Sequence, residues 1–252
     1  MEWVEAAVLA IALTGCSLLA YALRILDAKG AAASFGLGAI ILFAGGIPWF
    51  LLMVAFTGIA FIATKFGRRR KERFGTAEAH DGQRGAPNVF ANGAAPALAA
   101  VAALLIAETT AAPLAVTAAA WAYVTAVAAI TADTLASEIG GLSARTRSIL
   151  PPFEGSRPGV NGAVSRLGQL AALLGPVAIT VLAVPLLGLA WNLAWIPILG
   201  GFVASQMDSL LGATLEQDPV NLERPLSKGD VNFIASLLPM LAVLGGFWLA
   251  SL

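Results

Sequence analysis

The stretch NGAAPALAAVAALLIAETTAAPLAVTAAAWAYVTAVAAITADTL, residues 92–135, is apolar almost throughout and carries its polar groups chiefly at its two ends. It opens with Asn-Gly-Ala and closes with Asp-Thr-Leu, and residues 161–210 open with Asn-Gly-Ala and close with Asp-Ser-Leu. Each stretch is long enough for two membrane-spanning helices of roughly 20 residues, so its start and its end return to the same side of a bilayer. We therefore interpret 92–138 and 161–214 as a parallel internal repeat of two helix pairs.

The composition of the whole chain supports a membrane protein. Of its 252 residues, 58% are hydrophobic and only 12% are charged, and the mean hydropathy is +0.82. An ordinary soluble domain is about half apolar and a quarter charged. The sequence therefore predicts one integral membrane domain over 1–252, an all-α polytopic bundle of about eight transmembrane helices, with seven or nine as alternatives. The expected spans are approximately 3–23, 30–46, 48–64, 94–112, 113–132, 164–184, 193–213 and 231–250.

The basic residues are concentrated in three connections between these spans, at 24–29, 65–91 and 140–163. With eight spans, all three connections lie on the same side, and an excess of Lys and Arg marks that side as cytoplasmic. We expect a protein of the cytoplasmic membrane with 65–91 as a basic loop that contacts anionic lipid. The later loop at 214–230 is interpreted as a solvated acidic loop.

Three acidic residues fall at or near the cytoplasmic ends of predicted spans: Asp133, Glu138 and Asp208. A carboxylate within a membrane is costly unless it is paired or binds a cation, so such residues are functional candidates. The chain has one cysteine and one histidine, which excludes a thiolate or imidazole cluster. All three acids are therefore predicted metal ligands, and oxygen ligands favour Mg²⁺ or Mn²⁺.

The loop at 140–163 contains the most unusual segment, Arg157-Pro-Gly-Val-Asn-Gly-Ala. Glycine lets backbone N–H groups approach a phosphate closely, and an arginine can bind phosphate oxygens in bidentate fashion. The Walker spacing is absent, so this is not a P-loop. Helix N-termini also attract phosphate, and we expect Asn92 to cap one such terminus, Asn161 or Ser165 a second, and Asn232 a third. The predicted substrate- and nucleotide-binding residues are Arg84, Asn88, Asn92, Gly93, Ser137, Ser156, Gly159, Asn161, Gly162, Ser165, Ser209 and Asn232.

At these segments the chain resembles a known family, the integral membrane proteins related to the plant chloroplast phytyl-phosphate kinase of tocopherol biosynthesis, long catalogued as a domain of unknown function. The resemblance rests on QRGAPNVFANG at 83–93, DTLASEIG at 133–140, GVNGAVS at 159–165 and DSLLGA at 208–213. The family usually reads Asn-Gly-Gly where this chain has Asn161-Gly162-Ala163. The resemblance implies phosphoryl transfer from CTP or another nucleoside triphosphate to an isoprenyl monophosphate, which yields the diphosphate.

The residues and the resemblance suggest one mechanism. Asp133, Asp208 and Glu138 would hold the metal on the nucleotide, while Arg157, with Arg84 as a second cation, would neutralise the transferred phosphoryl group. The lipid tail would lie among the spans. A cytidylyltransferase acting on a lipid phosphate would use the same donor and ion, and a lipid or small-molecule transporter is a third possibility. Acids gathered near one face argue against alternating access, and no nucleic-acid partner is expected.

Overall fold

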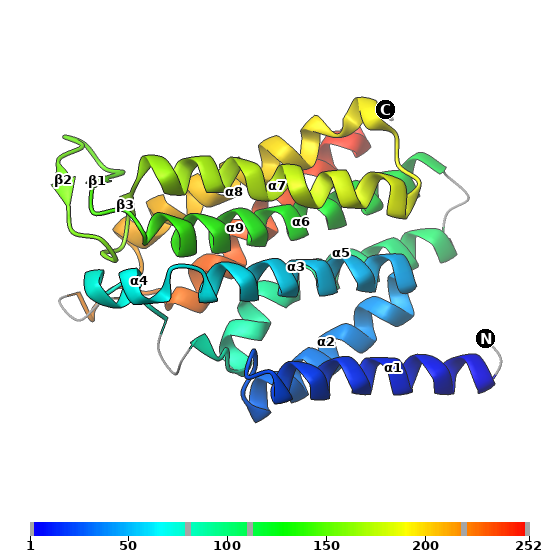
Figure 1. The fold of residues 1–252 in the computed structure, drawn as a ribbon. Helices are drawn as coiled ribbons and strands as arrows, with labels where there is room; N and C mark the ends of the chain where they lie inside the picture. The colour runs from blue at the N-terminus through cyan, green and yellow to red at the C-terminus, as the bar shows by residue number, and fades with distance from the viewer. Residues whose placement is uncertain (1–2, 79–81, 110–112, 218–220, 250–252) are drawn as a thin grey trace.

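The computed structural model describes residues 3–78, 82–109, 113–217 and 221–249. Within them the chain is mostly helical, and Figure 1 shows the long helices running side by side. The helices are α1 (Trp3–Ala22), α2 (Ala28–Gly45), α3 (Ile47–Lys65), α4 (Arg68–Phe74), α5 (Ala86–Thr109), α6 (Pro113–Gly140), α7 (Arg166–Leu187), α8 (Trp195–Thr214) and α9 (Lys228–Leu249), with a 3₁₀ turn at Trp191–Leu193.

The prediction of a polytopic membrane bundle is confirmed. In the described part of the chain, α2, α3, α5, α6, α7 and α9 are long and apolar enough to cross a membrane, and α1 contributes a shorter apolar stretch at Ala7–Ala22. The 20-residue α8 completes eight long helices. Figure 1 shows both chain ends at one end of the bundle, with α4 and the β-strands at the other. The connections at 65–91 and 140–163 therefore lie on the same side, as the eight-span arrangement requires.

Helix α6 is the centre of the bundle, since it packs against α3, α5, α7, α8 and α9. Helix α6 is rich in alanine, so its side chains are short, and small residues let membrane helices approach closely. A Cβ on Gly201 of α8 would lie 3.0 Å from the Ala128 carbonyl, and one on Gly168 of α7 would lie 2.9 Å from the Ala136 carbonyl oxygen. These contacts pack α7 and α8 closely against α6.

A small antiparallel sheet between α6 and α7 was not predicted. It consists of β1 (Thr146–Ser148), β2 (Gly155–Ser156) and β3 (Ala163–Val164), in the order β2-β1-β3. Strand β3 forms one edge of the sheet and contacts α8, whereas β2 forms the opposite edge. Strand β3 thus holds the end of the loop 140–163 against α8, whereas most of residues 151–160 are exposed.

Three predicted helix boundaries are wrong. Asn92 lies inside α5, which begins at Ala86, because Pro87 suits the first turn of a helix. The Asn92 amide donates instead to the Asn88 carbonyl at 2.9 Å. Asn232 lies inside α9 rather than at its start, and Asp133 lies two turns before the end of α6. Each helix therefore continues past its apolar segment into the polar surface layer.

Of the two expected caps for α7, the structure selects Ser165. Its backbone is extended at φ −124°, and its Oγ accepts a hydrogen bond from the Gly168 N–H at 3.0 Å, which is the usual N-cap geometry. Asn161 lies in the preceding turn. The prediction that Asn161 caps the helix is therefore wrong, and the prediction for Ser165 is confirmed.

Candidate functional site

A polar cavity of about 310 Å³ opens at the end of the bundle that carries the β-strands. Its walls come from the last turns of α6 and α8, the first turns of α7 and α9, the segment 75–78 and the loop 158–165. Most of the predicted site residues line it: Asp133, Ser137, Glu138, Gly159, Asn161, Gly162, Ser165, Asp208, Ser209 and Asn232. Four helices and two connecting segments therefore meet at one polar cavity.

The two aspartates of the proposed repeat meet in this cavity. Asp133 of α6 and Asp208 of α8 are half-buried, and their carboxyl groups lie within hydrogen-bonding reach of each other. Two adjacent carboxylates repel each other strongly away from bulk water, so the pair requires a proton or a cation between its members. This contact is the strongest chemical feature of the site.

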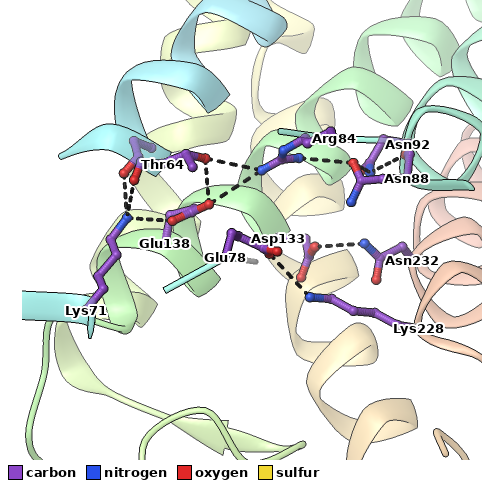
Figure 2. A network of polar contacts seen from close by, with 11 residues as sticks. Thr64, Lys71, Glu78, Arg84, Asn88, Asn92, Asp133, Glu138, Lys228 and Asn232 are labelled. Atoms are coloured by element: carbon purple, nitrogen blue, oxygen red, sulfur yellow. Dashed lines mark hydrogen bonds and ion pairs between the residues drawn. The ribbon is translucent and has the colours of Figure 1, made fainter. Parts of the chain in front are cut away.

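An amide and an amine complete the surroundings of the pair (Figure 2). The Asn232 amide lies 3.4 Å from Asp133 Oδ2, and in its alternative orientation it donates to Asp208 Oδ2 at 3.1 Å and to the Lys228 carbonyl at 2.9 Å. Lys228 begins α9, and its Nζ lies 3.5 Å from Glu78 Oε1 while its charge acts on both aspartates. The Lys228 side chain is 62% exposed, so it can move toward a ligand in the cavity.

The opposite wall is formed by the N-terminal turn of α7 and the glycine-rich loop before it, and the Gly168 and Gln169 N–H groups there donate to the Ser165 hydroxyl and carbonyl. The first turn of α7 lines the cavity at Gly168 and Gln169, and the loop before it carries Gly159 and Gly162 at φ +82° and +75°. A Cβ on Gly162 would lie 2.4 Å from the Ala213 Cβ, so this turn is pressed against α8. A helix N-terminus beside a glycine-rich turn suits a phosphate group.

Several residues of the site were missed from the sequence. Thr76, Glu78, Glu216 and Lys228 line the cavity, and Glu216 is only 9% exposed. The interpretation of 214–230 as a solvated acidic loop is therefore wrong at Glu216, which is buried, while Lys228 at the other end lines the cavity and is 62% exposed. The lysine at the start of the last span was the available signal, because a cation is unfavourable at a helix N-terminus unless an anion faces it.

Glu138 does not join the aspartate pair. It is 4% exposed and bonds to Lys71 Nζ at 2.5 Å and to Thr64 Oγ1 at 2.6 Å, with Arg84 Nη2 at 3.6 Å. Lys71 Nζ also donates to the Ala63 and Thr64 carbonyls at 2.7 and 3.2 Å (Figure 2). The predicted role of Glu138 as a metal ligand is not supported by this geometry, because its carboxylate is paired with Lys71. Among the residues that the structure describes, no three His, Cys, Asp or Glu side chains form a metal cluster.

Arg157 and Ser156 do not line the polar cavity. Ser156 belongs to β2, the strand farthest from the helices, and its carbonyl accepts a hydrogen bond from Thr146 Oγ1 at 2.6 Å. Arg157 follows it and is exposed. The predicted roles of both residues in phosphate binding are not supported by this geometry, because the sheet holds them at the outer edge of the loop.

Arg84, Asn88, Asn92 and Gly93 line a separate cavity of about 270 Å³ between α1, α2, α3 and α5. The structure thus separates these four predicted binding residues from the two aspartates. The sequence placed them on the same side of the membrane, but α5 packs against α2 and carries them away from the polar cavity. The Arg84 contact with Glu138 links the two cavities.

Comparisons with known proteins agree with a membrane family. Residues 11–239 match the family described as integral membrane protein DUF92. An uncharacterized membrane protein of Methanocaldococcus jannaschii is 28% identical over 215 residues, which cover 85% of this chain and 83% of the relative. Protein VTE6, chloroplastic, of Arabidopsis thaliana is 30% identical over 191 residues, which cover 76% of this chain and 56% of the relative.

Protein PGR of Arabidopsis thaliana is 30% identical over 213 residues, which cover 78% of this chain and 74% of the relative. No solved structure matches the chain significantly. Because the family model spans most of the sequence and the fold is a helical membrane bundle, this chain belongs to the DUF92 family of integral membrane proteins.

Proposed function

We propose that this protein is a membrane-embedded phosphotransferase that moves the terminal phosphoryl group of CTP, or of another nucleoside triphosphate, to an isoprenyl monophosphate. The observation that supports this most directly is the contact between Asp133 and Asp208 beside the N-terminus of α7. The class of reaction also follows the motif resemblance to the phytyl-phosphate kinase group, and 30% identity to VTE6 is compatible with it.

The aspartate pair fits Mg²⁺ or Mn²⁺. Mg²⁺ is commonly held by one or two carboxylates together with substrate phosphates rather than by an all-protein cage. Asp133 and Asp208 supply two such carboxylates, and since no third His, Cys, Asp or Glu of the described residues joins them in a metal cluster, the remaining coordination positions are left to phosphate oxygens. The ion would neutralise charge on the β- and γ-phosphates of the nucleotide.

The other residues of the cavity would bind and orient the phosphates. The N-terminus of α7, with its positive dipole end, and the glycine-rich turn at 159–162 line the cavity and suit anionic oxygens. Lys228 takes the role that the sequence assigned to Arg157, because it lines the cavity, its charge acts on both aspartates, and its 3.5 Å pair with Glu78 is partly exposed. Its positive charge would stabilise the phosphoryl group during transfer.

In the proposed reaction, an oxygen of the isoprenyl phosphate forms a bond to the γ-phosphorus as the bond from that phosphorus to the bridging oxygen breaks. The products are an isoprenyl diphosphate and a nucleoside diphosphate. A phosphate monoester is a competent nucleophile near neutral pH, so no general base is needed. The positive-inside pattern supports a site that faces the cytoplasm.

The test uses detergent-purified protein, Mg²⁺, γ-labelled CTP or ATP, and phytyl, farnesyl or geranylgeranyl phosphate, followed by identification of the lipid product. Label in an isoprenyl diphosphate is the expected result. Asp133→Asn and Asp208→Asn should each reduce the rate by at least about 10²-fold, the scale of losing one preorganised electrostatic group. Asp230→Asn is the matched control, because Asp230 is exposed and bonds only to Ser227 in the described contacts, a cap that Asn can replace.

Wild-type rates in both aspartate variants would overturn the metal assignment. Release of pyrophosphate with formation of an unlabelled CDP-lipid would move the assignment to a cytidylyltransferase. The absence of any reaction with every donor and acceptor would favour a transporter, in which the same carboxylate pair would bind a cation for transport.

A further inference from the structure

The cavity between α1, α2, α3 and α5 is apolar along nearly all of its walls. Leucine, isoleucine, phenylalanine, methionine and valine side chains from these four helices form them, and the described residues of the cavity contribute one ionic side chain, Arg84. Asn88, Asn92 and Thr64 lie beside this arginine. The cavity is therefore amphipathic, with a long apolar body and one polar end at the surface layer of the bundle.

Among the described residues, the Arg84 guanidinium at the polar end has one ion-pair partner, Glu138, which it shares with Lys71. Glu138 is bonded to Lys71 at 2.5 Å, whereas its distance to Arg84 is 3.6 Å. The other contacts of the guanidinium, to Asn88 Oδ1 at 3.4 Å and to Thr64 Oγ1 at 3.5 Å, are long and involve neutral groups. Lys71 and Arg84 thus share the Glu138 carboxylate, and Asp133 of the polar cavity is a further carboxylate that interacts with Arg84. An anion at Arg84 would complete the pairing.

This end also adjoins the polar cavity. Glu138 lines the polar cavity, while Thr64 and Arg84 line the apolar one, and the contacts among these three side chains form the partition between the two chambers (Figure 2). The charge of Arg84 also acts on Asp133. A phosphate bound at Arg84 therefore lies at the boundary of the chamber that contains the aspartate pair.

We propose that the apolar cavity binds the hydrocarbon chain of the lipid monophosphate acceptor, with its phosphate at Arg84. This assignment rests on the proposed function and names the part of the site that selects the acceptor. A cavity of about 150 Å³ accommodates benzene, so 270 Å³ holds roughly ten carbons of a chain. A longer chain would extend from the cavity between the helices into the bilayer.

The single cysteine of the chain provides a test that needs no turnover. Cys16 of α1 is exposed and lines the apolar cavity. Farnesyl phosphate is expected to slow alkylation of Cys16 by an apolar maleimide in detergent-purified protein. Farnesol, which lacks the phosphate, should protect only at a higher concentration. The control variant Cys16→Ala/Ile11→Cys moves the thiol to a position on α1 that is 72% exposed and outside the cavity, where farnesyl phosphate should not protect it.

Two glycines offer a matched pair of substitutions. A Cβ on Gly58 of α3 or on Gly36 of α2 would meet no atom within 4 Å, but only Gly58 lines the cavity. Gly58→Leu should raise the farnesyl phosphate concentration needed for half-protection of Cys16 by about tenfold or more, since each buried CH₂ group is worth roughly fourfold in affinity. Gly36→Leu should leave it unchanged.

The results separate this inference from the proposed function. Phosphoryl transfer without protection of Cys16, together with a neutral Gly58→Leu, would refute the cavity assignment and leave the kinase standing. Protection of Cys16 without phosphoryl transfer would support the binding site for the hydrocarbon chain and refute the proposed kinase activity. Equal protection by farnesyl phosphate, farnesol and dioleoyl phosphatidylglycerol would show a general lipid-filled cavity and overturn the assignment.

Discussion

The buried ion pair of Lys71 and Glu138 leads to the most quantitative prediction. Lys71 is 1% exposed and Glu138 is 4% exposed, and they join α4 to the last turn of α6 at 2.5 Å. Removal of one member leaves the other charge buried without its partner, which costs about 3–5 kcal/mol. Glu138→Gln should therefore lower the free energy of unfolding by about this amount, because it leaves the charges of both Lys71 and Arg84 without a carboxylate.

Lys71→Met should cost less than Glu138→Gln. In that variant Glu138 keeps its 2.6 Å hydrogen bond from Thr64 and can draw closer to Arg84, which already lies 3.6 Å away. The double variant Lys71→Met/Glu138→Gln should be less destabilised than the sum of the two single variants, with a coupling of about 0.5–3 kcal/mol.

The measurement is equilibrium unfolding in mixed micelles, followed by tryptophan fluorescence. Glu72→Gln is the control, because its pair with Arg68 on α4 also has a short distance, 2.9 Å, but its side chain is 52% exposed. An exposed helical pair of this kind is worth only about 0.3–0.5 kcal/mol. Similar losses in Glu138→Gln and Glu72→Gln, or strict additivity of the double variant, would refute the reasoning.

Two further predictions concern the packing around the sites. Gly162→Ala should destabilise the protein by about 1–3 kcal/mol and impair nucleotide binding, because the new Cβ would lie 2.4 Å from the Ala213 Cβ at a φ of +75°. Gly155→Ala, with no atom within 4 Å, should be neutral in the same unfolding and nucleotide-binding measurements. Tyr123→Phe removes the 2.6 Å hydrogen bond from the buried hydroxyl to the Trp49 carbonyl and should lower the free energy of unfolding by about 1 kcal/mol. An unchanged midpoint of the unfolding transition in Tyr123→Phe would contradict that estimate.

The sequence was informative where a property is local. Apolar length alone identified the long helices and their order, since a helix that crosses a bilayer needs about 20 apolar residues whatever its neighbours are. It was less reliable at helix ends. Helices α5 and α9 extend into the polar surface layer, where hydrogen bonding continues although hydrophobicity stops, so Asn92 and Asn232 lie inside helices and not at their caps.

The sequence by itself thus determined the membrane bundle, the side on which its polar clusters gather, and two intramembrane aspartates that require compensation. The tertiary structure alone decided how those clusters pair. It brought Asp133 and Asp208 together, paired Glu138 with Lys71, and placed Arg84 at the end of a separate apolar cavity. The physical reason is that a buried charge is compensated by whichever opposite charge helix packing brings within reach. Lys71 and Glu138 are 67 residues apart in sequence, and only the packing of the bundle makes them neighbours.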